Sequence, residues 1–252
     1  RTIAATLGAL DDKIEANRRA IRLMEQLGAA HMEEHVKLDA YGFPEYGVKT
    51  LGDMLSVLET GSRPRGGVST ETRGVVSLGA ESIQSAGVIS TTRFKFVTGE
   101  FANSMKRGRL VDGDVLVYKD GGTPGNFRPH VSAFGFGFPT SEATINEHVY
   151  RVRAVNEISQ AVLYWVLRSE WMDHEMRKRG TGVAIPGLNS ANFRSLPWPV
   201  VDATSLKTLN SHLRPLMERM LRLGAESARL AALRDALLPE LLSGRFQIAE
   251  WT

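Results

Sequence analysis

The sequence predicts an α+β protein in which a mixed α/β domain is flanked by two long α-helices of the coiled-coil type. Apolar residues recur in steps of three and four at both ends of the 252-residue chain, and the middle instead has strand-like runs separated by glycine-rich turns. We expect a long helix over residues 1–30, a domain over 31–202, a second long helix over 203–245 and a short tail over 246–252.

The N-terminal helix is predicted from a heptad seam with one polar member. The seam follows steps of four and three through Ile3, Leu7, Leu10, Ile14, Asn17, Ile21 and Met24. A polar residue at such a position sets the register of a helix pair at some cost in stability. We therefore expect Asn17 to set the register and the apolar members to make the pairing contacts, namely Leu7, Leu10, Ile14 and Ile21.

The C-terminal helix shows the same rhythm more strongly. Asp202, Thr204 or Ser205 can cap its start, Gly244 can close its end, and Pro215 is expected to bend it. An apolar stripe of this length needs a partner, either the other helix or another chain, although two ordinary core helices of one domain are the alternative. The expected pairing residues are Leu213, Leu216, Met220, Leu223, Leu230 and Leu237.

The middle of the chain is predicted to alternate strands and turns. The strand-like runs are Gly74–Leu78, Val88–Val97, Asp114–Lys119, Val131–Phe138 and His148–Val155. A helix follows, which Asn156 can cap and which ends at Gly180 after three consecutive basic residues. These elements predict a mixed α/β domain.

Composition excludes several classes of protein. The chain has no cysteine, so disulfide frameworks, zinc ribbons and thiol nucleophiles are excluded. It has no apolar run long enough to cross a membrane, so we expect no membrane contact and a cytoplasmic location. The formal net charge of +3 is compatible with an acidic partner without requiring one.

Catalytic and metal-binding motifs are weak. His31 to His35 spell H-x-x-E-H, the inverted zinc-peptidase pattern, but no distant acidic third ligand is marked, so we expect no metal. Residues 121–126 are glycine-rich but lack the spacing of a phosphate-binding loop, and a surface turn is the better interpretation. No G-x-S-x-G elbow is present. We expect no catalytic residues.

Basic residues are concentrated in one part of the middle. Residues 61–130 contain ten Lys or Arg and six Asp or Glu, so their net charge is 10 − 6 = +4. Arginine and lysine in loops can reach DNA phosphates or base edges, although a solvated surface of average charge would look the same. The expected DNA contacts are Arg63, Arg65, Lys106, Arg107, Arg109 and Arg128.

Nearly the whole chain resembles the specificity (S) subunits of type I restriction–modification systems. The segment from Ile3 to Arg19 resembles their central conserved helix, and Leu233–Gly244 resembles the closing one. Leu51–Leu55 followed by Thr60–Pro64 is similar to the opening of a target recognition domain. The remaining landmarks are Gly113–Val117 and Gly180–Asn189 leading into Leu196–Val200.

The resemblance implies a DNA-reading subunit without catalysis of its own, binding one half-site of a two-part target. In that family two modification subunits carry S-adenosylmethionine, and a restriction subunit can join them. The family has two recognition domains per subunit and this sequence has one, so we expect either half of a subunit or a homodimer paired through the long helices. Such a homodimer would read an interrupted palindrome. The alternative is a coiled-coil scaffold or adaptor without DNA binding.

Overall fold

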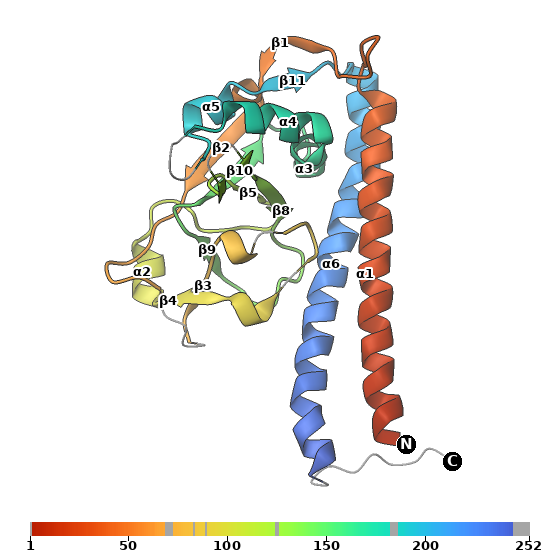
Figure 1. Cartoon of the computed structure of the whole chain (residues 1–252), viewed down its shortest axis with the longest axis vertical. Helices are drawn as coiled ribbons and strands as arrows, with labels where there is room; N and C mark the ends of the chain where they lie inside the picture. Colours follow the sequence, from red (N-terminus) through yellow and green to blue (C-terminus); the bar gives the residue numbers. More distant parts are fainter. Residues whose placement is uncertain are drawn as a thin grey trace.

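Two long helices lie side by side along one flank of a mixed α/β domain (Figure 1). The computed structural model describes residues 2–68, 73–82, 84–88, 90–123, 126–181 and 186–243. The helices are α1 (Thr2–His35) and α6 (Ala203–Leu242). Because the sheets and short helices all come from the chain between them, the predicted class is confirmed.

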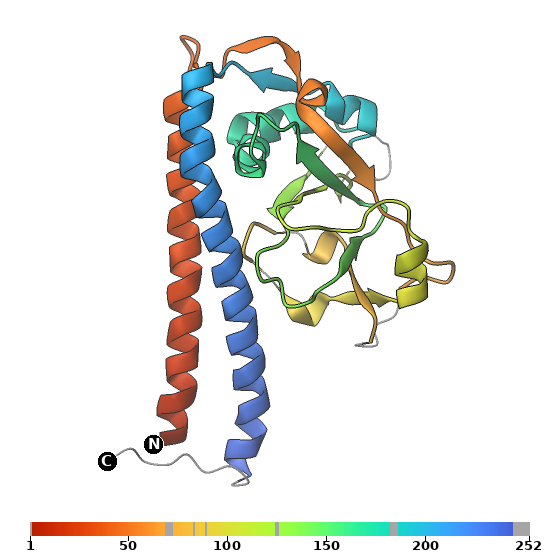
Figure 2. The same cartoon turned by 180° about the vertical axis from the view of Figure 1, so that it is seen from behind.

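The two helices run antiparallel and pair with one another within the chain (Figures 1 and 2). Asn17 Nδ2 donates hydrogen bonds to Glu226 Oε2 at 3.0 Å and to Ser227 Oγ at 3.3 Å. Further along, Arg234 Nη1 pairs with Asp11 Oδ1 at 2.6 Å. The polar seam residue is therefore buried and bonded across the pair, in the position from which it can set the register.

The expected pairing residues differ in burial along the seam. Those near the middle of the pair are mostly buried, and those toward the N-terminus of α1 and the C-terminus of α6 are half-buried; Leu216 is half-buried although it lies between buried neighbours. The buried members are Ile14, Ile21, Leu213, Met220 and Leu223, and the half-buried members are Leu7, Leu10, Leu216, Leu230 and Leu237.

The helix ends depart slightly from the expected bounds. α1 continues past residue 30 to His35. α6 begins after Asp202, whose Oδ1 accepts hydrogen bonds from the backbone N–H groups of Thr204 and Ser205 at 2.9 Å. It continues through Pro215 to Leu242, and Gly244 lies outside the described residues.

The domain is built on two small sheets. The larger is antiparallel in the order β2-β10-β5-β8, and the smaller has the order β4-β3-β9 with β3 and β9 parallel. Two strand pairs accompany them, β1 with β11 and β6 with β7. The strands are β1 (Tyr46–Thr50), β2 (Leu55–Thr60), β3 (Val75–Leu78), β4 (Lys95–Val97), β5 (Val115–Tyr118), β6 (Gly122–Thr123), β7 (Asn126–Phe127), β8 (His130–Ala133), β9 (Ala143–Ile145), β10 (Val149–Ala154) and β11 (Pro197–Pro199).

Short helices complete the domain, and one prediction about them was wrong. The single helix expected after Asn156 is two helices, because the Ser169 hydroxyl accepts a hydrogen bond from the N–H of Met172 and starts a new helix there. Ser159 caps the first of them in place of Asn156. The helices are α2 (Gly99–Ser104), α3 (Gln160–Arg168), α4 (Glu170–Arg179), α5 (Ser190–Arg194) and the single turns η1 (Leu51–Met54), η2 (Ala80–Ser82) and η3 (Thr91–Arg93).

The long strand expected over Val88–Val97 is also much shorter in the structure. Only Lys95–Val97 pairs with a neighbouring strand, because the chain turns through η3 immediately before it. The other four predicted runs each match an observed strand, namely β3, β5, β8 and β10, with β8 starting one residue earlier than predicted, at His130.

Helix α3 anchors the domain to the helix pair through Glu25 and Gly28 of α1. The Tyr164 hydroxyl donates to Glu25 Oε2 at 2.9 Å, the Trp165 Nε1–H donates to the Glu25 carbonyl oxygen at 3.2 Å, and Arg168 Nε pairs with Glu25 Oε1 at 2.9 Å. A Cβ at Gly28 would lie 2.1 Å from the Trp165 ring, so glycine allows the indole to rest against the helix. The domain is thus tied to α1 by four neighbouring polar and packing contacts.

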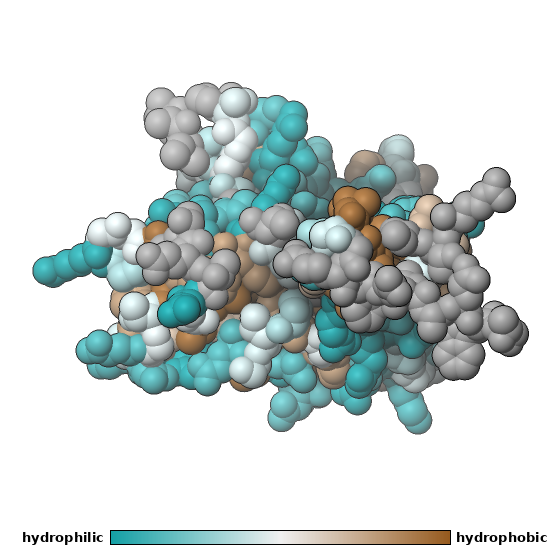
Figure 3. Space-filling view, turned by 90° about the horizontal axis from the view of Figure 1, so that it is seen from below, coloured by the Kyte–Doolittle hydropathy of each residue, from teal (hydrophilic) through white to brown (hydrophobic). Residues whose placement is uncertain are grey.

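The helix pair extends beyond the domain at the end where α1 starts (Figure 1). Leu233, Leu238 and Leu242 of α6 are 48%, 42% and 73% exposed there. Viewed from below, hydrophobic residues are visible among mainly hydrophilic ones (Figure 3). Among the described residues, no helix combines the length and the apolar character needed to span a membrane.

Candidate nucleic-acid interface

One end of the four-stranded sheet brings distant loops together. Thr60, at the end of β2, pairs with Tyr150 near the start of β10. The neighbouring residue Val149 of β10 pairs with Tyr118, at the end of β5. Tyr118 in turn pairs with His130, at the start of β8. The loops that follow β2 and β5 and those that precede β10 and β8 therefore leave the sheet at the same end. We call this region the loop end of the sheet.

A row of charged side chains crosses the loop end. Arg63 Nε lies 2.9 Å from Glu147 Oε1, and His148 Nε2 lies 3.4 Å from the same oxygen. His148 Nδ1 lies 2.9 Å from Asp120 Oδ2, which also accepts from Lys119 Nζ at 2.8 Å. Of these residues, only Arg63 belongs to the predicted set. The others flank strands β5 and β10, and the sequence shows no signal that these strand ends meet.

The next two predicted contacts lie on adjoining loops. Gly61 and Gly108 touch, because a Cβ at Gly108 would lie 2.7 Å from the Gly61 Cα. Arg65 is carried by the first loop, and Lys106 and Arg107 precede Gly108 in the second. All three side chains are exposed, and none has an ion-pair partner within the described part of the chain.

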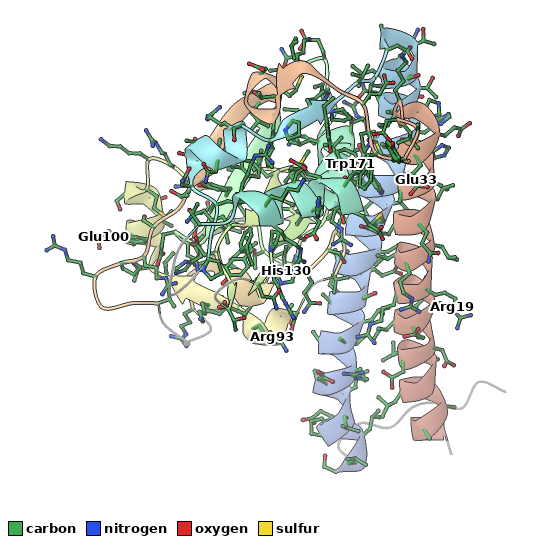
Figure 4. The ribbon with its side chains drawn as sticks, turned by 45° about the horizontal axis from the view of Figure 1, so that its top comes forward. Arg19, Glu33, Arg93, Glu100, His130 and Trp171 are labelled. Atoms are coloured by element: carbon green, nitrogen blue, oxygen red, sulfur yellow. The ribbon has the colours of Figure 1, made fainter. Side chains whose placement is uncertain are left out.

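Figure 4 shows this side of the domain beyond α2, where Glu100 is labelled, far from the helix pair. Glu59 ties the second loop to the sheet, since its Oε2 accepts from the Gly108 N–H and from Arg151 Nη1, both at 3.1 Å. The backbone of the second loop is therefore held in place at Gly108, while the basic side chains of both loops are exposed.

Arg109 differs from its neighbours because its guanidinium is bonded inside the domain. Nη1 donates to the Ala102 carbonyl oxygen at 3.3 Å and to Asn103 Oδ1 at 2.9 Å, and Nη2 pairs with Glu142 at 3.4 Å. These contacts hold the end of α2 against the sheet. A DNA contact at Arg109 stays a prediction, with structural bonds competing for the same donors.

Arg128 lies at the opposite edge of the loop end, two residues before β8. Its side chain is exposed. His130, two residues further on, has its pKa lowered, first by burial and then by Arg168, with Arg177 and Arg128 adding smaller effects against Asp173. Arg128 therefore adds positive charge beside an imidazole that is neutral at neutral pH.

The remaining sequence motifs have ordinary local settings. Gly121 and Gly122 take positive φ angles of 150° and 96°, Gly121 just before β6 and Gly122 as its first residue, while Pro124 and Gly125 of the same motif lie outside the described residues. His31 and His35 lie in the last turns of α1, away from the loop end.

Comparisons with known proteins place the fold. No protein-family model and no curated protein matches the sequence. Among solved structures, an S subunit of a type I restriction–modification system from M. genitalium superposes with a TM-score of 0.53 at 17% identity, covering 100% of this chain and 61% of that one. The chain therefore has the fold of a type I S subunit, as the sequence resemblance predicted.

Two further solved structures are similar at lower scores. The HsdS subunit from Thermoanaerobacter tengcongensis gives a TM-score of 0.46 at 14% identity, over 95% of this chain and 55% of that one. A chain from a structure of type I restriction–modification complex assembly and conformational transition gives 0.48 at 17% identity, over 95% and 58%. The chain thus spans between 55% and 61% of the lengths of the structures it matches.

Proposed function

We propose that this protein is a non-catalytic DNA-recognition subunit of a type I restriction–modification system, with one recognition domain carried by a helical spacer. The observation that supports this most directly is the pairing of an S-subunit fold with exposed basic loops at the loop end of the sheet. The residues that contact the DNA duplex are Arg63, Arg65, Lys106, Arg107 and Arg128. The helix pair holds the recognition domain at a fixed distance from a second recognition domain, its counterpart.

A second copy of the chain would provide that counterpart. The chain matches 61% of the length of the M. genitalium S subunit, and the helix pair extends past its own domain with three leucines exposed. Two copies related by a two-fold axis would present two identical readers, so the target is an interrupted palindrome. Modification subunits that bind S-adenosylmethionine would carry out methyl transfer, and a restriction subunit would join them.

DNA binding is tested by salt titration with matched variants. Replacing Arg63, Arg65, Lys106 and Arg107 together by alanine is expected to weaken binding to every duplex and to reduce the salt slope by about 0.9 per lost phosphate contact. The matched control removes four exposed charges from the helices instead: Arg18, Arg19, Lys207 and Arg219. Fluorescence anisotropy of labelled duplex, measured on the assembled methyltransferase, would reject the site if both variants lose affinity equally.

Sequence selection separates this function from the adaptor alternative. A recognition subunit enriches one bipartite sequence from a random duplex pool, whereas an adaptor enriches none. Selection of an interrupted palindrome would favour two copies, and selection of an asymmetric target would favour a longer subunit with a second, different domain.

A further inference from the structure

The C-terminal end of α1 carries a cluster of metal-binding side chains. His31 and His35 are four residues apart, so their imidazoles share one face of the helix. Together with Glu34 they offer one ligand atom each, and these atoms lie within 4.8 Å of one another. The two imidazoles are 24% and 18% exposed, so they are partly withdrawn from water, whereas the carboxylate is 71% exposed and free to move.

A third imidazole reaches this cluster from the antiparallel helix. His212 of α6 packs against His31 with ring centroids 4.9 Å apart at an angle of 48°. The register that joins Asn17 to Ser227 also puts this residue beside the end of α1. The sequence marks no acidic ligand from a distant segment, and the helix pair supplies a histidine from α6 instead.

The hydrogen bonding suits a metal ligand at His35. Its Nδ1 lies 3.0 Å from the carbonyl oxygen of His31, and an N–H there leaves the lone pair of Nε2 free. Metal-binding histidines commonly donate their other ring nitrogen to a backbone carbonyl in this way. Glu34 Oε2 lies 3.9 Å from Nδ1 of His31, so the carboxylate can reach an ion bound at that nitrogen.

We propose that His31, Glu34, His35 and His212 bind a zinc ion that bridges α1 and α6. Three imidazoles and one carboxylate are ligands that zinc prefers, at bond lengths of about 2.0–2.2 Å. Rotation of the exposed side chains of Glu34 and His212 would bring the four ligand atoms closer together and into tetrahedral geometry around the ion. With four protein ligands the site is structural, unlike the open site of a peptidase. It braces the spacer at the end nearest the domain and does not depend on DNA binding.

The proposal is tested by zinc titration of the full chain without a polyhistidine tag. Isothermal calorimetry is expected to show one zinc ion per chain, with cobalt absorption as a second probe. The double variant His31→Ala/His35→Ala is expected to abolish binding. The matched control His148→Ala/His174→Ala removes two histidines elsewhere and is expected to bind normally. Circular dichroism shows whether each variant is folded.

The bridge between helices is tested separately by His212→Ala. Loss of this ligand is expected to reduce zinc affinity at least about tenfold, because even the loss of an outer partner of a ligand has that effect. Unchanged affinity would show that α1 alone holds the ion and would overturn the bridge. Equal binding by the wild-type chain and the His31→Ala/His35→Ala variant, or no stoichiometric binding by the wild type, would overturn the site itself.

Discussion

At the anchor between α3 and the helix pair, polar groups bond inside the protein, whereas two of the basic side chains at the loop end of the sheet are exposed and unpaired among the described residues. At the anchor, the Tyr164 hydroxyl is buried, donates to Glu25 and accepts from the Ala86 N–H at 3.1 Å. At the loop end, Arg65 and Arg107 are exposed and have no ion-pair partner among the described residues.

This difference in the bonding of polar groups corresponds to two different roles in the protein. Buried polar groups need hydrogen-bond partners inside the protein, because leaving one unpaired costs about 1–3 kcal/mol of stability. The resulting hydrogen bonds fix the relative positions of the groups that they join. Exposed arginines lose little without a partner and remain available to a ligand that brings its own negative charge. The anchor therefore serves to hold the domain in one orientation on the spacer, and the loop end remains open to a partner.

The largest expected effect is at the anchor. Trp165 is 2% exposed and packs against Gly28 of α1. Truncation in Trp165→Ala leaves a cavity and removes the hydrogen bond to Glu25, so the free energy of unfolding should fall by about 3–5 kcal/mol. Urea denaturation followed by circular dichroism measures this change.

Arg107→Ala is the control from the other region. Substitutions of exposed residues away from buried contacts usually change stability by less than about 0.5 kcal/mol. If Arg107→Ala destabilises the chain as much as Trp165→Ala, the contrast between a structural anchor and a free loop end is wrong.

A pair of glycines in α1 gives a finer test with the same substitution. A Cβ at Gly28 meets the Trp165 ring at 2.1 Å, whereas a Cβ at Gly8 meets nothing within 4 Å. Gly28→Ala should lower the free energy of unfolding by about 1–3 kcal/mol through overpacking. Gly8→Ala should raise it by roughly 0.5–1 kcal/mol, since alanine favours the helix. Thermal denaturation would contradict the anchor if both variants shifted the same way.

The sequence predicts the helix pair better than the rest of the fold, because two paired helices need apolar residues at regular intervals along the chain. Ile14, Asn17 and Ile21 are buried at the spacing that the heptad indicates. The same period does not reveal that α6 has a second buried face, where Gly224 approaches the backbone of Gly87 so closely that a Cβ would lie 2.1 Å from its carbonyl oxygen. One periodic stripe cannot show how many partners a helix has.

The loop end was only partly predictable for a topological reason. Composition points to Arg63, which the structure does place there. Arg63 lies beside Glu147, His148 and Asp120 only because β10 lies between β2 and β5 in the sheet. No local sequence pattern predicts this strand order. Charge counting also could not separate Arg109, which is bonded to Asn103, from Arg107, which is exposed and has no ion-pair partner among the described residues.

The smallest expected effect concerns the titration of His130 beside Arg128. Burial is the main cause that lowers the pKa of this imidazole below its ordinary value of 6.5, followed by Arg168. The folded chain then binds a proton less readily than the unfolded chain, so this contribution to stability is present above pH 6.5 and is lost as the pH falls through the folded pKa. Arg128→Gln should raise the pKa slightly, as measured by NMR titration of the ring.

The same resonance tests whether DNA lies at the loop end. DNA phosphates near Arg128 would bring negative charge close to His130 and favour the protonated imidazole, so adding duplex should raise the pKa of His130 in the wild-type chain. High salt should reverse that shift by releasing the duplex. A pKa that stays unchanged while anisotropy shows the DNA to be bound would place the duplex away from this edge of the sheet. The contacts would then be limited to the loops of Arg65 and Arg107.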